Sequence, residues 1–161
     1  MTRKLAALRR LSTRQWLLLI ESTLFLMVAA AVIAFLPFLF AARQASGRVR
    51  RPLRDPDSQR VREIGRIIEA VARRLPFRAK CFESGLAAQW MLRRRGIAAT
   101  LFYGASLKPD GALSAHVWVR AGEIDVVGCT NASDFAVLAR FPEPDQPAAP
   151  SSGSKRPPLI R

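Results

Sequence analysis

Cys81-Phe-Glu-Ser-Gly-Leu-Ala-Ala-Gln-Trp-Met-Leu-Arg-Arg-Arg95 is the part of the chain on which its architecture depends. Apolar residues recur along it at helical spacing and Gly96 follows as a C-cap, so we expect a helix that begins at Cys81. A thiol at a helix start feels the positive end of the helix dipole, which favours the thiolate. The chain has a single histidine, His116, so any Cys–His mechanism must use that residue.

The composition limits the classes of protein that this chain can represent. It has 161 residues, with 26 Lys and Arg against 12 Asp and Glu, which gives a net charge of +14. Such a charge attracts anionic membranes, nucleic acid or acidic peptides. The basic stretches contain few aromatic residues, which argues against a nucleic-acid partner. The length suits one domain with an appendage.

The two cysteines, Cys81 and Cys129, form neither a metal-ligand motif nor a disulfide framework. We therefore predict no metal and no cofactor, and the absence of a Gly-rich phosphate loop predicts no bound nucleotide. Free thiols in a reducing cytoplasm are the favoured interpretation. A disulfide between the two cysteines is the alternative, and it would suit an exported protein.

The N-terminal region is dominated by a hydrophobic run. Residues 1–15 are basic, residues 16–43 are predicted to form a long hydrophobic helix, and no charged residue occurs from Ser22 to Ala42. Such a run is long enough to span a bilayer. Glu21, Pro37 and basic residues on both sides weaken that interpretation. The alternatives are a helix buried against the domain or a partner, and a cleaved signal peptide.

The rest of the chain predicts an α+β domain at residues 58–142, in which a helix packs on a small antiparallel sheet. Residues 44–57 form a predicted linker, and residues 143–161 a predicted disordered tail. Ser58 is the expected cap of a first helix, which Pro76 ends. Strands are expected over residues 98–103, 114–120, 123–127 and 135–141.

The connection between the second and third strands predicts a position for an acidic residue. If Arg120 faces Glu123 across it, then Asp125 faces Trp118 and shares a face with His116. Asp125 would then be a diagonal neighbour of His116, and its carboxylate could fix the imidazole tautomer. A pairing shifted by one residue would place Asp125 on the other face.

Each of these residues also has a purely structural interpretation. Cys81 could be a small apolar residue at a buried helix start, His116 a core histidine, and Asp125 a solvated strand residue. Cys129 is expected to be structural. Asp134 is the reserve candidate for the acidic position. A cysteine at a helix start followed by His and Asp on successive strands is the layout of papain-like and transglutaminase-like cysteine catalysts.

Four blocks of the sequence carry a family resemblance: Cys81–Ile97, Leu101-Phe-Tyr-Gly104, Ala115-His-Val-Trp-Val119 and Phe135-Ala-Val-Leu-Ala-Arg-Phe-Pro142. They resemble the lasso-peptide biosynthesis B protein, and more narrowly its transglutaminase-like leader-peptidase domain in the stand-alone form. The resemblance covers about residues 58–142.

The resemblance implies a cysteine protease that removes the leader from a ribosomally made precursor peptide. Cys81 would be the nucleophile, His116 the base and Asp125 the third member of the triad. A separate leader-recognition protein and an ATP-dependent lasso cyclase are the implied partners. We expect a cytoplasmic location with membrane contact through residues 16–43. The competing prediction is a membrane-anchored basic binding or assembly protein without catalytic activity.

Overall fold

The computed structural model describes residues 12–49, 56–75 and 81–143. The predictions for most of the basic segment 1–15, the centre of the linker 44–57 and nearly all of the tail 143–161 lie outside these ranges.

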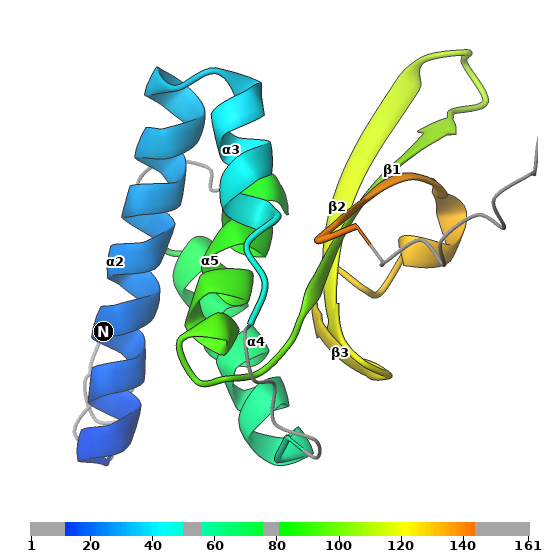
Figure 1. Cartoon of the computed structure of the whole chain (residues 1–161). Helices are drawn as coiled ribbons and strands as arrows, with labels where there is room; N and C mark the ends of the chain where they lie inside the picture. Colours follow the sequence, from blue (N-terminus) through cyan, green and yellow to red (C-terminus); the bar gives the residue numbers. More distant parts are fainter. Residues whose placement is uncertain (1–11, 50–55, 76–80, 144–161) are drawn as a thin grey trace, which may run out of the picture.

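Within the described ranges, four helices lie on one side of a four-stranded antiparallel sheet (Figure 1). The helices are α2 (Thr13–Phe35), α3 (Phe38–Ala45), α4 (Ser58–Ala72) and α5 (Cys81–Arg93). The strands are β1 (Thr100–Leu107), β2 (Leu113–Ala121), β3 (Ile124–Val127) and β4 (Ala136–Phe141), with the 3-10 turn η1 (Ala132–Asp134) before β4. Their order in the sheet is β3-β2-β1-β4, which confirms the predicted α+β class.

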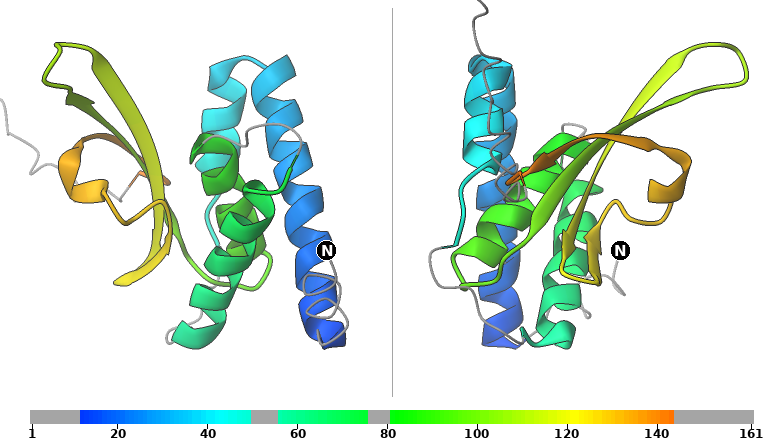
Figure 2. Two further views of the ribbon diagram at one scale, coloured as in Figure 1. Left: turned by 180° about the vertical axis from the view of Figure 1, so that it is seen from behind. Right: turned by 45° about the vertical axis from the view of Figure 1, so that its right-hand side comes forward.

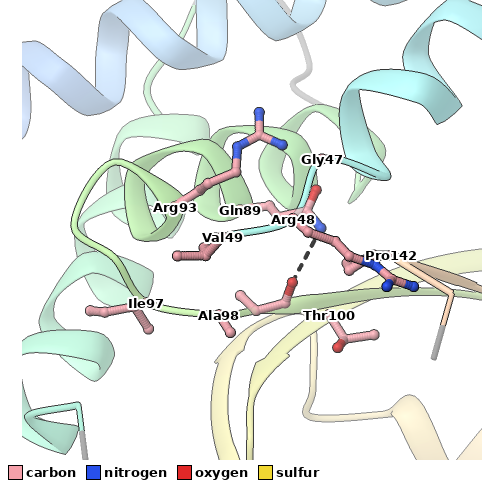
Figure 3. Close-up of a pocket in the computed structure, with 10 residues that line it drawn as sticks. Gly47, Arg48, Val49, Gln89, Arg93, Ile97, Ala98, Thr100 and Pro142 are labelled. Atoms are coloured by element: carbon pink, nitrogen blue, oxygen red, sulfur yellow. Dashed lines mark hydrogen bonds between the residues drawn. The ribbon is translucent and has the colours of Figure 1, made fainter. Parts of the chain in front are cut away.

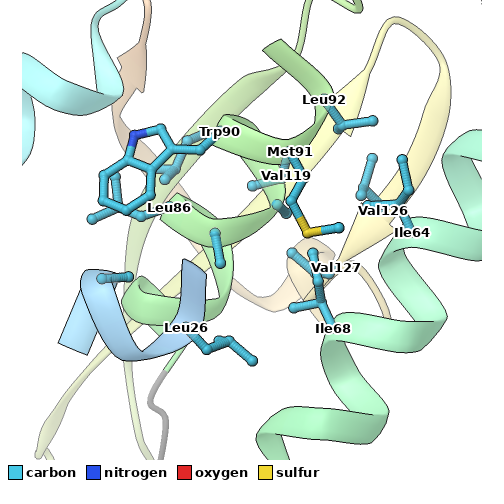
Figure 4. Close-up of a cluster of buried hydrophobic side chains, with 14 of the residues drawn as sticks. Leu26, Ile64, Ile68, Leu86, Trp90, Met91, Leu92, Val119, Val126 and Val127 are labelled. Carbon is cyan, nitrogen blue, oxygen red and sulfur yellow. The ribbon is translucent and has the colours of Figure 1, made fainter. Parts of the chain in front are cut away.

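The buried centre of the molecule is α5, which lies between α2 and the sheet (Figures 1 and 2). Gly85 brings the helix close to the sheet, since a Cβ built there would lie 2.9 Å from Val117 Cγ1. On other sides Leu86 and Met91 are fully buried in a cluster shared with α2 and α4 (Figure 4). The helix that carries Cys81 is therefore fixed by packing along most of its length.

The helix α4 covers the end of the sheet where β3 lies. Its cap is Asp57 rather than the predicted Ser58, because the Asp57 carboxylate accepts hydrogen bonds from the N–H groups of Gln59 (2.9 Å) and Arg60 (3.3 Å). Its apolar residues Val61, Ile64, Ile68 and Val71 are buried. Gly65 lies against the backbone of β3: a Cβ built there would be only 2.0 Å from the Val126 carbonyl oxygen.

The helix α2 packs on α4 and α5 as part of the same core. Leu18, Ser22, Leu26 and Ala29 are its buried residues. Glu21, the acidic residue inside the apolar run, forms an ion pair with Arg95, whose Nη1 donates to Glu21 Oε1 at 2.9 Å. In the described part of the chain, α2 is also the one helix long and apolar enough to cross a membrane.

The register of the β2–β3 hairpin differs from the predicted one. Ala121 pairs with Ile124 and Arg120 with Asp125, so Asp125 does not face Trp118. The turn is formed by Gly122 and Glu123, one residue later than expected, because Gly122 takes the left-handed conformation (φ +58°) that a tight hairpin requires. The pairing shifts again between β2 residues 119 and 120. The prediction that Asp125 neighbours His116 is therefore wrong.

Candidate functional site

Cys81 opens into a cleft of about 380 Å³ at the start of α5. It is the first residue of the helix, its side chain is partly buried, and its thiol is free. The end of α4, the middle of β2 and the loop after β3 form the other walls. The residues that line the cleft are Glu69, Ala72, Arg73, Cys81, Ser84, Val117, Val127, Gly128 and Thr130.

His116 is held by the backbone of the loop after β3. Its Nε2 lies 2.7 Å from the Gly128 carbonyl oxygen. A carbonyl can only accept, so Nε2 carries the proton and Nδ1 has the free lone pair that a base needs. The ring packs against Trp118 and Phe135, with centroid separations of 6.0 and 4.9 Å.

The thiol and the imidazole lie on different faces of β2. The side chains of Val117 and Val119 point to α5, which they meet at Gly85. Because successive strand residues alternate, His116 leaves on the opposite face, where it stacks on Trp118. Among the described residues, no hydrogen bond joins Cys81 to His116. The structure therefore does not assemble the predicted Cys–His pair.

Gly128 borders both groups. It lines the Cys81 cleft, and its carbonyl oxygen binds the imidazole. The strand β3 pairs with β2 only at Val119–Ala121. Beside His116 and Val117 the edge of β2 therefore faces the loop that begins at Gly128.

The predicted acidic residues lie elsewhere. Asp125 is exposed and accepts a hydrogen bond from Arg120 Nε at 2.8 Å, which raises the pKa of Arg120. Asp134 is in η1, where its carboxylate accepts from the Ser133 hydroxyl. The group that orients the imidazole is instead the Gly128 carbonyl. Sequence reasoning missed it because a backbone acceptor has no residue signature beyond the glycine itself.

Cys129 is in a structural setting, as expected. Its Sγ donates to the carbonyl oxygens of Val119 (3.2 Å) and Val127 (3.4 Å). Burial raises the pKa of this thiol, so it stays protonated. It is a free cysteine in the structure, and the alternative disulfide with Cys81 is not formed.

A second cavity, of about 180 Å³, lies at the other end of α5 (Figure 3). Its floor is Gln89, whose Nε2 donates to the carbonyl oxygens of Ala99 (3.2 Å) and Phe141 (2.8 Å). Arg93 beside it donates to the Gln44 carbonyl oxygen, and burial lowers its pKa. These contacts tie α5 to the ends of β1 and β4. We assign this cavity a structural role.

Within the described ranges, no three His, Cys, Asp or Glu side chains come together as metal ligands. The search among curated proteins and the search among solved structures gave no significant match. The comparison with family models did: residues 23–140, well over half of the chain, match the model of the transglutaminase-like superfamily. The match begins inside α2 and ends in β4, so it includes Cys81, His116 and all of α4, which packs against α5. This chain therefore belongs to the transglutaminase-like superfamily.

Proposed function

We propose that the chain is a cysteine peptidase of lasso-peptide biosynthesis, which cleaves the leader from a ribosomally made precursor. The observation that carries the proposal is the position of Cys81 as the first residue of α5, in a cleft whose wall at Gly128 holds the chain's single imidazole. Membership of the transglutaminase-like superfamily supports cysteine-based acyl chemistry. The resemblance of residues 81–97 and 115–119 to the B protein supports the leader-peptidase role.

The proposed reaction uses Cys81 as nucleophile and His116 as base. His116 Nδ1 takes the thiol proton, and Sγ attacks the carbonyl carbon at the leader–core junction. The backbone N–H of Cys81 stabilises the oxyanion. The imidazolium then protonates the leaving amine as the C–N bond breaks. Water attacks the thioester, Nδ1 accepts its proton, and the leader leaves with a free carboxylate while the thiol is restored.

This reaction requires a movement of the loop after β3. The imidazole must pass around the edge of β2 that the Gly128 loop covers to reach the thiol, which means breaking its hydrogen bond to Gly128. Such a bond contributes only about 0.5–1.5 kcal/mol net, so the binding of precursor or partner can supply the free energy. Catalytic hydrogen bonds often form only in the substrate complex. We propose that the resting structure is a disassembled form of the site.

The third member of the triad needs its own test. The family resemblance assigns it to Asp125, but the carboxylate of this residue binds Arg120. If Asp125 moves to His116 in the active form, then Asp125→Asn should reduce cleavage about 10⁴-fold, as removal of a triad carboxylate does. If no carboxylate orients the ring in the active form, the same variant should cleave at nearly the wild-type rate. The resting contacts favour the second outcome.

The main experiment measures precursor cleavage with the leader-recognition partner present. Cys81→Ala and His116→Ala should each abolish cleavage, while the matched thiol variant Cys129→Ala should retain it. Undiminished cleavage by either of the first two variants would end the proposal. A circular dichroism melt of each variant separates loss of chemistry from loss of fold.

The proposed partners follow from the reaction. A separate protein presents the leader, and an ATP-dependent lasso cyclase uses the amino terminus that cleavage frees. We place the enzyme on the cytoplasmic side of the membrane, in contact with it through residues 16–43. The competing function is that of a basic binding or assembly protein at the membrane. Two observations favour it: the net charge of +14 and the separation of Cys81 from His116. In that case Cys81→Ala would have no effect on the output of the pathway.

A further inference from the structure

An apolar stripe runs along the outer face of α2, away from the domain. Its residues follow one another at intervals of three and four, the spacing of one helix face. From Leu17 to Phe35, which follows 18 positions later in the same helix, the stripe extends for about 27 Å. Its large members and their exposed fractions are Leu17 (63%), Ile20 (60%), Leu24 (59%), Met27 (54%) and Phe35 (85%).

The stripe continues around the turn between α2 and α3, where Leu36, Leu39 and Phe40 are also exposed. Next to it is an apolar groove of about 390 Å³ between α2, α3 and α5. Trp90 lines this groove, and its buried indole N–H has no hydrogen-bond partner in the part of the chain that the structure describes. Figure 4 shows the indole nitrogen on the side of the ring that faces away from the labelled core residues.

Cationic side chains border this apolar surface. Arg93 and Arg94 line the groove, and the Arg94 side chain is 67% exposed. Arg43 is exposed in the last turn of α3. The exposed guanidinium groups therefore lie beside the apolar area, as they do on proteins that bind the headgroups and acyl chains of anionic lipids together.

The packing of the opposite face of α2 on the domain is incompatible with a membrane-spanning position of this helix. Leu18, Leu26 and Ala29 are buried against α4 and α5, and Glu21 is paired with Arg95. Insertion across a bilayer would expose this core and separate the ion pair. The family match from residue 23 onward also includes most of α2. The lipid can therefore reach only the outer stripe.

We propose that α2 lies in the plane of an anionic bilayer surface, with the α2–α3 turn inserted and the groove occupied by an acyl chain. The inference deepens the membrane contact proposed above and is independent of the peptidase step. A bilayer is favoured over a protein partner because the stripe offers only apolar side chains. Specific protein interfaces need about one hydrogen bond per 100–200 Å².

The test is sedimentation of the full chain with phosphatidylcholine vesicles, with and without phosphatidylglycerol. The wild type should bind the anionic vesicles at least about tenfold more tightly, a preference that falls with salt. Leu24→Glu/Met27→Glu should weaken binding roughly 100-fold, because two side chains no longer enter the lipid. Leu107→Glu/Leu113→Glu is the matched control: both leucines are about as exposed (75% and 74%) but lie on the β1–β2 hairpin.

Three results would overturn the proposal. The stripe variant could bind as tightly as the hairpin control. The wild type could fail to bind vesicles and instead form a dimer that the stripe variant abolishes. In that case a second copy of the chain, rather than lipid, would cover the stripe. The protein could resist extraction by alkaline carbonate, which would indicate a spanning helix. Because no substrate is present and Cys81→Ala should bind vesicles normally, failure here is distinguishable from failure of the peptidase proposal.

Discussion

The ion pair between Glu21 and Arg95 allows a direct test of whether α2 is part of the domain. The guanidinium donates to both carboxylate oxygens, and the two side chains are only 16% and 19% exposed. Glu21→Gln would leave Arg95 largely buried without its counter-charge. Breaking a fully buried pair from one side costs about 3–5 kcal/mol. Because some exposure remains here, we expect a loss of roughly 2–3 kcal/mol in the free energy of unfolding.

Urea denaturation followed by tryptophan fluorescence measures this loss, since Trp90 of α5 packs against Phe25 of α2 with ring centroids 6.0 Å apart. Arg14→Gln is the control, because it removes the exposed ion pair with Glu63 and should cost under about 1 kcal/mol. The double variant Glu21→Leu/Arg95→Met should recover part of the stability, since neither charge remains buried. If Glu21→Gln costs no more than the control, α2 does not contribute to the core as described.

Three further outcomes are expected. Gly65→Ala should destabilise the domain by roughly 1–3 kcal/mol, seen as a lower Tm, because a Cβ would lie 2.0 Å from the Val126 carbonyl oxygen; an unchanged Tm would contradict the close packing of α4 on β3. Gln89→Leu should cost about 1–3 kcal/mol in urea denaturation, because the part-buried carbonyl oxygens of Ala99 and Phe141 lose their donor. Near neutral pH, iodoacetamide should modify Cys81 at least about tenfold faster than Cys129, whose pKa is raised by burial. That ratio should shrink as the pH rises toward the pKa of Cys129, and equal rates at neutral pH would refute the assignment.

Local patterns in the sequence were enough to predict most elements. The helical spacing after Cys81 and the alternation on the strands depend on neighbours along the chain, so the starts of α4 and α5 and the four strands agree with the prediction. The single helix predicted over residues 16–43 is wrong: the chain forms two helices, α2 and α3, that are separated at Pro37. Gly104 shows where such reasoning fails. It was expected to end a strand, but β1 continues to Leu107. The glycine is needed because a Cβ there would lie 2.9 Å from the Trp118 ring, so it marks a close approach rather than a strand end.

The relation between Cys81, His116 and Asp125 depends on long-range choices that local patterns do not encode. A shift of one residue in the turn at Gly122 moves Asp125 by two positions along β2, from Trp118 to Arg120, and so away from His116. The free-energy difference between two such turns is small compared with the packing that selects one of them. Packing is also what directs Val117 to Gly85 of α5, and alternation then places His116 on the other face. The same constraint explains why the loop at Gly128 is the element that would have to move. A strand packed on a helix cannot rotate without opening the core, so an approach of the imidazole to the thiol would require the Gly128 loop to leave the edge of β2 and the His116 side chain to rotate.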